Sequence, residues 1–555
     1  MDAIKAFLEI NRLAVDFDTR EGNVRAVNDV SLSLNKGDRV AIVGESGSGK
    51  SVTAYALLSL LGDNGKIAAG SIYFDGMALH KASNSLLKDI RGREISMIFQ
   101  NPMSALNPIR KVGEQISDML RQHAQATKAS APKKVRELLG QVEIKDLERV
   151  MHAYPFELSG GMCQRVMIAL ALACNSRLLI ADEPTTGLDV TTQKAIMDLI
   201  EQLSIRENLS VILITHDLGV ASQYCNKFVV MEKGRVVESS DDHSLFSSPQ
   251  HPYTRKLLAA TPNLGSRLEQ LTPELPNDWI AECPEPSHEI LLEVKNLVKK
   301  YPLKGSTIGK PTTFFNAVDG VSFTINKGEC VGLVGESGCG KSSTSKMIAR
   351  LDSVSGGEII FAGEDIASMS DKQFVAGPYR KQIQMVFQDP TGSLNPRHTV
   401  LQLITEPLKR LEKIRDKKTL RELALVLCAD VGLPKNLIER LPHQLSGGQK
   451  ARVGIARAIA LKPKLLILDE PTSALDVSVQ AIVLQLLERL RRKLSLSYLF
   501  VSHDLNVVNM LSQRVLVMEK GKIVEAGLTR NVLNDPQHSF TKTLIAAIPQ
   551  MPVSV

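Results

Sequence analysis

Short apolar runs that end in a polar or charged group recur along this chain. The run "RVAIVG" (39–44) leads into the Gly-rich stretch "ESGSGKS" (45–51) and then into the apolar, helix-forming run "VTAYALLSLLG" (52–62). Apolar runs of this length around a Gly-rich stretch predict a strand, a loop and a helix in that order. A later run, "LLIADEP" (178–184), predicts a buried strand that ends in two carboxylates.

The whole pattern occurs twice, which makes the chain a tandem duplication of a unit of roughly 260 residues. "IVGESGSGKS" (42–51) recurs as "LVGESGCGKS" (333–342), and "LLIADEPTTGLDV" (178–190) recurs as "LLILDEPTSALDV" (465–477). The Gly-rich copies are 291 positions apart and the Asp-Glu copies 287, so the small insertions fall early and the later half keeps its register.

We therefore expect two domains, residues 1–262 and 290–555, joined by a linker over residues 263–289. The linker is rich in Pro and acidic residues and has no sustained apolar period. A chain of 555 residues also exceeds what one hydrophobic core usually organises.

Composition adds little beyond this organisation. Hydrophobic residues make up 43% of the chain, and no apolar stretch approaches the ~18 to 20 residues that span a bilayer. The start "MDAIKAFLEI" does not resemble a secretory signal, so we expect the protein to reside in the cytosol. Seven scattered cysteines without a CxxC pair predict neither disulfides nor a zinc site, and a net charge of +7 argues only weakly for an anionic partner.

Each Gly-rich stretch fits the phosphate-loop pattern GxxxxGK[ST]. Glycines let backbone N–H groups wrap phosphates, the lysine neutralises the outer phosphates, and the Ser hydroxyl ligates Mg²⁺. A single match can be a structural Gly loop, but two copies between a strand and a helix favour ATP binding. The predicted loop residues are Gly44, Glu45, Ser46, Gly47, Ser48, Gly49, Lys50 and Ser51, then Gly335, Glu336, Ser337, Gly338, Cys339, Gly340, Lys341 and Ser342.

The two carboxylates after each later strand have separate expected roles. Asp182 would hold Mg²⁺, and Glu183 would polarise an attacking water. Asp469 and Glu470 repeat the pair. The alternative is that these acids only cap a strand before a Pro, and a phosphate loop in both halves disfavours it.

Two further polar positions end apolar runs in both halves. His216 and His503 each follow their Glu by 33 residues, which favours a γ-phosphate contact over a core or turn histidine. Gln100 and Gln388 end "MIFQ" and "MVFQ", where the amide can reach Mg²⁺ or the water. The predicted metal ligands are thus Ser51, Gln100 and Asp182, then Ser342, Gln388 and Asp469.

The phosphate loop, the Gln, "LSGG", "DEP", "LDV" and "HD" follow one another in this order in both halves. In this order they resemble the nucleotide-binding domains of the ATP-binding cassette (ABC) family over nearly the whole chain. The resemblance implies an α/β fold with two P-loop NTPase (RecA-like) domains in tandem. Each domain would carry an antiparallel β subdomain and a helical signature subdomain.

The same resemblance assigns further residues to the ATP sites. It implies that Phe17 and Tyr301 stack on adenine, with a strand residue packed in the core as the alternative for either. Gln100 and Gln388 would be Q-loop glutamines, and His216 and His503 switch histidines. The signature loops would be Ser159, Gly160, Gly161 and Met162, then Ser446, Gly447, Gly448 and Gln449, and the D-loop residues Asp189 and Asp476.

In this family the phosphate loop of one domain faces the signature loop of the other. The resemblance therefore implies an internal pseudo-dimer with two shared sites, and both are expected to hydrolyse ATP because both keep the Glu, His and Gln. Met162 stands where the second signature has Gln449, and we expect it to border the site built on Lys341 and Glu470.

Sequences after each Q-loop Gln and the tails "HPYTRKLLAATP" and "HSFTKTLIAAIP" resemble the oligopeptide and dipeptide importer ATPases. This implies two membrane permease subunits, an extracytoplasmic solute-binding protein and a place at the cytoplasmic face of the membrane. The segments 101–157 and 389–444 would receive the permeases' coupling helices. Peptide is the favoured solute, with glutathione, nickel, opine and oligosaccharide left open.

Some members of this group hold an iron–sulfur cluster after the ATPase domain. Here the linker contains one cysteine, Cys283, and no cysteine follows Cys428, so no iron–sulfur cluster is expected. The alternative from another class is a soluble ribosome-associated twin-cassette ATPase, which generally has a longer, strongly charged helical linker. No nucleic-acid partner is expected.

Overall fold

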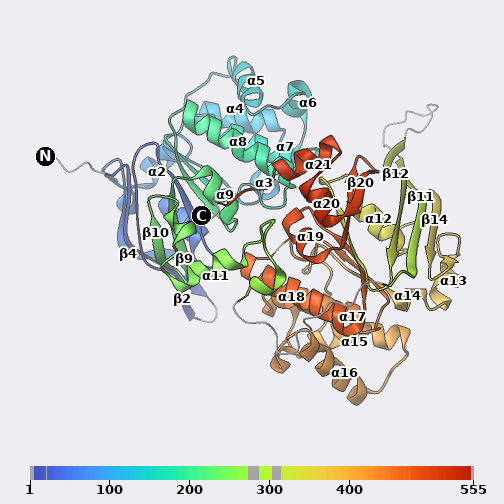
Figure 1. Cartoon of the computed structure of the whole chain (residues 1–555). Coiled ribbons are helices and arrows are strands. Elements are labelled where there is room, and N and C mark those ends of the chain that lie inside the picture. The colour runs from blue at the N-terminus through green and yellow to red at the C-terminus, as the bar shows by residue number, and fades with distance from the viewer. Residues whose placement is uncertain (1–5, 20–21, 273–286, 303–313, 474, 552–555) are drawn as a thin grey trace. The chain divides into compact units, whose positions relative to one another are not determined.

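The computed structural model describes residues 6–19, 22–272, 287–302, 314–473 and 475–551. The chain divides into two compact units, which are described separately (Figure 1). Unit 1 comprises residues 1–188, 192–261 and 549–555, and unit 2 comprises residues 189–191 and 262–548. Within the described ranges, no helix combines the length and the apolar character needed to cross a membrane.

The centre of unit 1 is a six-stranded sheet in the order β10-β9-β3-β8-β7-β6. All its pairs are parallel except β9 with β10. Its middle strands are almost wholly buried, which explains their continuous apolar runs, because both faces of a parallel sheet are covered. The strands are β3 (Arg39–Val43), β6 (Ile95–Ile98), β7 (Leu178–Asp182), β8 (Ser210–Thr215), β9 (Lys227–Glu232) and β10 (Arg235–Ser240).

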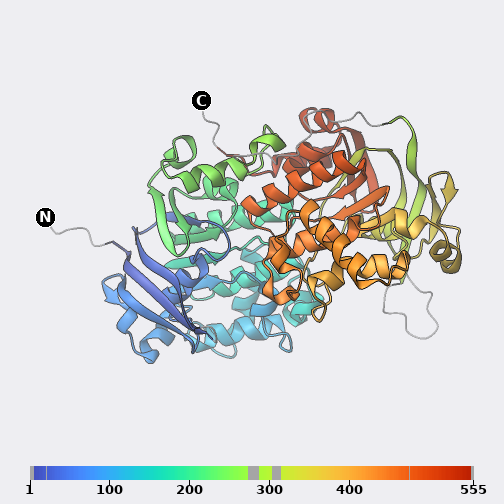
Figure 2. The same cartoon turned by 90° about the horizontal axis from the view of Figure 1, so that it is seen from below.

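A second sheet of unit 1 is antiparallel and has the order β2-β1-β4-β5 (Figure 2). One apolar core joins this sheet to one side of the central sheet, and another core joins the other side to the helices. The predicted antiparallel subdomain is thus present. Its strands are β1 (Leu8–Thr19), β2 (Gly22–Leu34), β4 (Gly65–Phe74) and β5 (Met77–Ala78).

Helices α3 to α6 precede the signature helix α7 and form the helical subdomain with it, in which α3, α4 and α5 pack against α7 and α6 packs against α4 and α5. The helices of unit 1 are α1 (Lys50–Leu57), α2 (Asn84–Ile90), α3 (Pro102–Ala105), α4 (Val112–Gln122), α5 (Ala131–Gln141), α6 (Leu147–His152), α7 (Gly160–Leu172), α8 (Val190–Arg206), α9 (Leu218–Tyr224), α10 (Ser244–Ser247) and α11 (Pro252–Ala260), with 3-10 turns η1 (Leu79–Lys81) and η2 (Pro155–Glu157). Helix α1 ends earlier than the apolar run 52–62 predicts, because Ser59 adopts a left-handed φ of 52° that an α-helix does not continue through.

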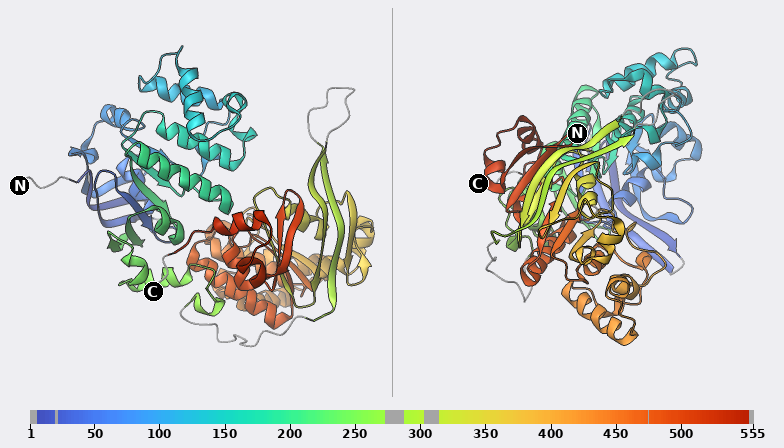
Figure 3. Two further views of the ribbon diagram at one scale, coloured as in Figure 1. Left: turned by 45° about the horizontal axis from the view of Figure 1, so that its top comes forward. Right: turned by 90° about the vertical axis from the view of Figure 1, so that its right-hand side faces the viewer.

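Unit 2 repeats both sheets, in the orders β16-β17-β18-β13-β19-β20 and β12-β11-β14-β15 (Figure 3). Its strands are β11 (Ile290–Pro302), β12 (Phe314–Asn326), β13 (Cys330–Val334), β14 (Gly356–Phe361), β15 (Glu364–Asp365), β16 (Ile383–Val386), β17 (Leu465–Asp469), β18 (Ser497–Val501), β19 (Arg514–Glu519) and β20 (Lys522–Leu528). Its helices are α12 (Lys341–Ile348), α13 (Asp371–Ala376), α14 (Tyr379–Gln382), α15 (Val400–Leu411), α16 (Lys417–Asp430), α17 (Gly447–Ile459), α18 (Val477–Leu494), α19 (Leu505–Leu511), α20 (Thr529–Asn534) and α21 (Ser539–Ala546), with 3-10 turns η3 (Leu268–Gln270), η4 (Lys435–Leu437) and η5 (Pro442–Gln444).

The segment that follows α11 is part of unit 2. Leu268 and Leu271 are 5% and 1% exposed, and Gln485 on α18 donates a hydrogen bond to the carbonyl of Leu268 at 2.7 Å. Residues 263–272 of the expected linker therefore pack within unit 2, whereas residues 273–286, including Cys283, lie outside the described residues.

The segment that follows α21 is, in turn, part of unit 1. Met551 packs against the helical core of unit 1, and Pro549 lies against Gly219 of α9 so closely that a side chain at that glycine would meet it. Residues 549–551 lie 287 positions after residues 262–264, which is the offset of the duplication, so the two short segments occupy equivalent places in the repeated sequence.

Candidate functional site

The phosphate loop of unit 1 joins β3 to α1. Gly44 has φ 152° and Gly49 has φ 98°, and a Cβ at Gly44 would collide with the main-chain oxygen of Met231. Only glycine fits there, which explains its place in the motif. The buried Lys50 folds over the loop and donates from Nζ to the carbonyls of Gly44 (2.7 Å) and Glu45 (2.9 Å).

Unit 2 builds the same loop between β13 and α12. Gly335 and Gly340 have φ 152° and 109°. Lys341 donates from Nζ to the carbonyls of Gly335 and Glu336, both at 2.8 Å. One side chain differs, because Cys339 replaces the Ser of unit 1 and places its Sγ 3.8 Å from Nζ of Lys341.

A hydroxyl and a carboxylate meet beside each loop. Ser51 donates to Oδ1 of Asp182 at 2.9 Å, and Ser342 donates to Oδ1 of Asp469 at 3.1 Å. Burial raises the pKa of both aspartates, against the opposing hydrogen bonds from the serines. Oδ2 of Asp182 is buried and has no hydrogen-bond partner among the described residues.

These groups fit a magnesium ion. Mg²⁺ prefers oxygen ligands, and the loop serine, the buried aspartate and a nearby amide supply them. The partnerless Oδ2 of Asp182 is an acceptor that a cation would satisfy, and the ion's charge would offset the cost of burying the carboxylate. In the described ranges, no three His, Cys, Asp or Glu side chains gather as a metal-ligand group of their own.

The glutamate after each aspartate has an unusual backbone. Glu183 and Glu470 have φ 46° and 47°, a left-handed conformation that is rare outside glycine. Their amides donate to the carbonyls of Ile214 (2.8 Å) and Val501 (2.9 Å) on the neighbouring strands. These bonds hold the turn, and strain of this kind is typical of functional positions.

Three predicted residues converge in unit 1. Oε2 of Glu183 accepts hydrogen bonds from Gln100 (2.8 Å) and Thr186 (2.9 Å), and Nδ1 of His216 lies 3.4 Å from Oε1. Burial alone would raise the pKa of Glu183, but the hydrogen bond and charge of His216, together with the hydrogen bonds from Thr186 and Gln100, outweigh it and lower this pKa to about 2. The carboxylate is therefore ionised at neutral pH.

The equivalent trio converges in unit 2. Gln388 donates to Oε2 of Glu470 at 2.9 Å, and Nδ1 of His503 lies 3.2 Å from the same oxygen. Burial again opposes the shift, yet His503 lowers the pKa of Glu470. In both units burial would lower the pKa of the histidine, but the adjacent glutamate raises it.

The signature serines open helices, as expected. Ser446 is the N-cap of α17 and forms a complete capping box, in which Gln449 N–H donates to Ser446 Oγ (3.3 Å) and Ser446 N–H donates to Gln449 Oε1 (3.0 Å). Ser159 caps α7 through the N–H of Met162 alone (3.4 Å). Met162 has no side-chain oxygen to accept the N–H of Ser159, so the second bond of the capping box is missing. The Met162 side chain is partly buried and packs against the apolar core.

The remaining predicted residues are two aromatic residues and two aspartates that lie outside the Gln-Glu-His trios. Phe17 on β1 is half-buried and packs against the core, whereas Tyr301 on β11 is 38% exposed and donates to Oδ2 of Asp352 at 2.7 Å. Asp189 accepts a hydrogen bond from the hydroxyl of Thr191 at 2.8 Å, and Asp476 is the N-cap of α18.

Two contributors were not predicted from the sequence. Tyr253, in the tail "HPYT", places its hydroxyl 3.0 Å from the amide of Glu45 and so supports the phosphate loop of unit 1. The available signal was the repeated tail itself, although its second copy has Phe540, which lacks the hydroxyl. Thr186, the other unpredicted partner, carried no signal.

Two glycine-rich phosphate loops, each beside a buried aspartate and a Gln-Glu-His trio, define the class of protein as a tandem P-loop ATPase. The chain belongs to the ABC transporter family, whose model matches residues 27–186 and 318–473. The model of the oligopeptide/dipeptide transporter C-terminal region matches residues 237–281 and 524–554. A model of an AAA domain (putative AbiEii toxin, type IV TA system) also matches residues 152–222.

Curated relatives agree with this assignment. The glutathione import ATP-binding proteins GsiA of Escherichia coli O6:H1 (strain CFT073) and of Escherichia coli (strain K12) are each 42% identical over 563 residues, covering 98% of this chain and 89% of theirs. Among solved structures, a dimeric post-hydrolysis state of an ATP-binding cassette bound to ADP and Pi is 28% identical, covering 43% of this chain and 99% of its own, with a TM-score of 0.39.

The predicted family, the tandem α/β fold and the ATPase activity are thereby confirmed. The protein is an ATP-hydrolysing subunit of an importer of the oligopeptide/dipeptide group.

Proposed function

We propose that the protein drives the import of glutathione or of short peptides of similar chemistry. The observation that carries this proposal is 42% identity over 98% of the chain to proteins named as glutathione import ATP-binding proteins. The oligopeptide/dipeptide C-terminal region, matched in both halves, supports the peptide-like class over nickel, opine or oligosaccharide.

Within each site the residues have distinct proposed roles. Mg²⁺, held by Ser51, Asp182 and Gln100, would neutralise charge on the β- and γ-phosphates. Lys50 would leave its loop carbonyls to contact the outer phosphates. Glu183, ionised at neutral pH with a pKa of about 2, is a weak base, so it would orient the attacking water by accepting its hydrogen bond rather than remove its proton fully.

His216 would contact the γ-phosphate. Its pKa is raised by Glu183 against the effect of burial, which favours the protonated form that donates to an anion. Ser342, Asp469, Gln388, Glu470 and His503 would play the same parts in the second site, and Phe17 and Tyr301 would stack on the two adenines.

The two cassettes would pair with each other. In this arrangement the signature loop led by Ser446 completes the site of Lys50, and the loop led by Ser159 completes the site of Lys341. The repeated sequence supports domain limits of 1–262 and 290–555 with a linker over 263–289, although residues 263–272 pack with unit 2 and residues 549–551 with unit 1.

Two permease subunits and a solute-binding protein would complete the transporter, with this chain bound at the cytoplasmic face of the membrane. The helical subdomain of unit 1 offers suitable contact residues, because Ile109 and Phe156 are 82% and 64% exposed. Exposed large apolar side chains of this kind often mark an interaction site.

The decisive experiment reconstitutes the full transporter in vesicles with its binding protein. Reduced glutathione, a tripeptide of neutral side chains and Ni²⁺ are compared as solutes, and both ATP turnover and solute uptake are measured. Stimulation and uptake with glutathione or the tripeptide support the proposal. Stimulation by Ni²⁺ alone, or by none of the three solutes, overturns it.

A further inference from the structure

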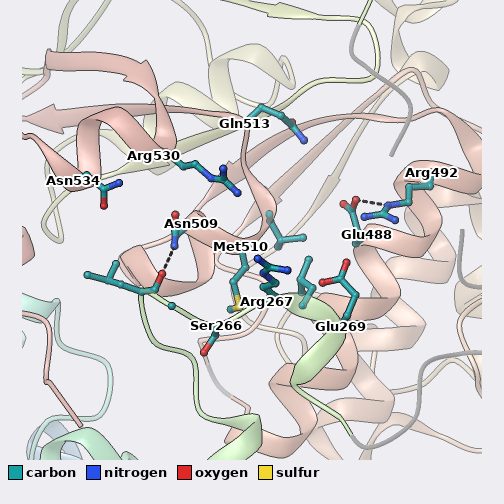
Figure 4. Close-up of a pocket in the computed structure, with 14 residues that line it drawn as sticks. Ser266, Arg267, Glu269, Glu488, Arg492, Asn509, Met510, Gln513, Arg530 and Asn534 are labelled. Atoms are coloured by element: carbon teal, nitrogen blue, oxygen red, sulfur yellow. Dashed lines mark hydrogen bonds and ion pairs between the residues drawn. The ribbon is translucent and has the colours of Figure 1, made fainter. Parts of the chain in front are cut away.

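A cavity of about 710 Å³ lies within unit 2, away from the phosphate loop (Figure 4). Its walls come from residues 264–269, the C-terminal ends of α18 and α19, and helix α20. Four separate pieces of the chain thus contribute polar side chains to one space. A cavity of this size can hold a small molecule.

Three arginines from three of these pieces line the cavity. Arg267 precedes η3, Arg492 lies in the last turn of α18, and Arg530 lies on α20. The guanidinium groups of Arg267 and Arg530 point toward the same space, and within the described part of the chain neither has a hydrogen-bond or ion-pair partner (Figure 4). Two like charges that converge in this way favour an anion between them.

The acidic residues of the cavity do not cancel this charge. Glu488 is bound by two buried arginines, at 2.8 Å from Arg491 and 2.6 Å from Arg492, so its charge is already matched. Glu269, the other acid, is exposed, as Arg267 and Arg530 also are, and the three arginines of the cavity outnumber its two acids by one. The C-terminal ends of α18 and α19 carry partial negative charge and disfavour an anion, so the arginines have to supply the attraction.

A neutral donor and a rigid wall complete the site. The side chain of Arg492 is only 7% exposed, which fixes one charged wall of the cavity. Oε1 of Gln513 accepts the amide of Cys330 at 2.8 Å, which leaves the NH₂ group of Gln513 as a donor. Asn509 donates to the carbonyl of Leu264 at 2.9 Å and thereby holds the segment 264–269 against α19.

The first copy of the sequence does not carry the same set. At the equivalent positions, 287 residues earlier, Ile205 stands for Arg492 and His243 stands for Arg530. Ile205 is 69% exposed, and Nε2 of His243 is 2.9 Å from the carbonyl of Ser222. Because both copies keep the predicted ATP-site residues, the chemistry that they share does not require these arginines.

We propose that this cavity is a binding site for a small anion with at least two phosphate or carboxylate groups. Arg267 and Arg530 each bind one group of the ligand, and the buried Arg492 adds its charge from the wall. Because Arg267 belongs to the segment after α11 and Arg530 to α20, the bound anion joins that segment to the body of unit 2.

Binding is tested on the full-length protein by isothermal titration calorimetry. Saturating Mg·ADP keeps both phosphate loops occupied, so that the titrated anion reports on the cavity. Succinate and pyrophosphate are titrated separately, which distinguishes a dicarboxylate from a diphosphate ligand. We expect at least one of them to bind at one site per chain, and more weakly at high salt because the attraction is between charges.

Variants then locate the binding. Arg530→His introduces the residue of the first copy, and both it and Arg267→Ala should weaken binding about tenfold, the loss expected for one charge-assisted partner. Lys493→Ala removes a positive charge beside Arg492 but does not line the cavity, so it should bind as the wild type does. Arg530→Lys keeps the charge and should lose less than Arg530→His.

Two results would overturn the proposal. One is the absence of binding by either probe to the wild type at millimolar concentration. The other is binding by Arg267→Ala and Arg530→His that equals the wild type. Circular dichroism of each variant confirms folding, and the graded comparison of Arg530→Lys with Arg530→His separates loss of charge from loss of structure.

Discussion

Nε2 of Gln100 donates a hydrogen bond to Oε2 of Glu183 over 2.8 Å, although 83 positions separate the two residues. Gln388 and Glu470 repeat this bond at 2.9 Å. Each Gln comes directly before the chain segment that enters the helical subdomain. The bond therefore joins the proposed permease-binding part of each unit to the carboxylate of its ATP site.

We expect the double variant Glu183→Gln, Glu470→Gln to lower ATP turnover at least 100-fold, because the amide orients the water without a negative charge. Each single variant should keep measurable turnover from the other site. The measurement is steady-state phosphate release, together with retention of bound ATP. Glu201→Gln, a matched change outside the site, should leave turnover unchanged, and wild-type turnover by the double variant would contradict the assignment.

The pairing of Glu183 with His216 predicts how stability depends on pH. The pKa of Glu183 falls from 4.5 to about 2 on folding, so its contribution is present above pH 4.5 and is lost as the pH falls toward 2. The pKa of His216 rises above 6.5, so its contribution is present below pH 6.5 and is lost as the pH rises through the folded value.

Urea unfolding of the wild type across this pH range, compared with Glu183→Gln, measures both effects. In Glu183→Gln the stability should fall less than in the wild type as the pH rises above 6.5, because His216 no longer faces the carboxylate of Glu183. An identical pH profile for the two proteins would show that the pair does not control the titration.

Met162→Gln should stabilise the first signature helix. Gln at this position can complete the capping box that Ser446 and Gln449 form in unit 2, and one such bond contributes about 0.5–1 kcal/mol. Urea unfolding should show this gain, and Gln449→Met should show a loss of similar size. A destabilised Met162→Gln would mean that the packing of Met162 against the core outweighs the cap.

The same substitution tests which ATP site the first signature borders. ATP turnover is measured for Met162→Gln combined with Lys50→Ala or with Lys341→Ala. We expect Met162→Gln to change turnover in the Lys50→Ala background, where the Lys341 site is intact. In the Lys341→Ala background, where only the Lys50 site is intact, we expect no change. The opposite result would reverse the pairing of the cassettes.

Tyr253→Phe should weaken nucleotide binding at the first site only. The change removes the hydroxyl that lies 3.0 Å from the amide of Glu45, at a cost of about 0.5–1.5 kcal/mol, or severalfold in affinity. Fluorescent ATP binding in a Lys341→Ala background isolates this site. Tyr224→Phe, a change of the same type in another buried tyrosine of unit 1, is the control and should leave affinity unchanged.

Much of each site is predictable from the sequence because its residues lie at fixed local spacings. The glycines before Lys50 and the Asp-Glu pair at the end of a buried run fix the strand-loop-helix geometry within a few residues. His216 and Gln100 could be placed because each ends an apolar run, and the carboxyl ends of parallel strands meet at one edge of a sheet.

The rest depends on contacts between distant parts of the chain. Tyr253 reaches Glu45 across 208 positions, and the repeated tail around Tyr253 does not indicate which residue it contacts. The Pro-rich composition after α11 predicts a linker, yet Leu268 and Leu271 find a buried place on unit 2. Helix α1 also ends at a backbone turn at Ser59 that the apolar run does not reveal.

The packing of residues 262–272 with unit 2 and of residues 549–551 with unit 1 has a consequence for synthesis at the ribosome. Unit 1 includes Pro549 and Met551, which follow residues 262–548 of unit 2 along the chain, so unit 1 is completed only after that part of unit 2 has been made. Residues 262–272 emerge early but have nothing to pack against until α18 follows. The last contacts of unit 1 therefore wait until unit 2 has been made, whereas residues 262–272 wait only for α18.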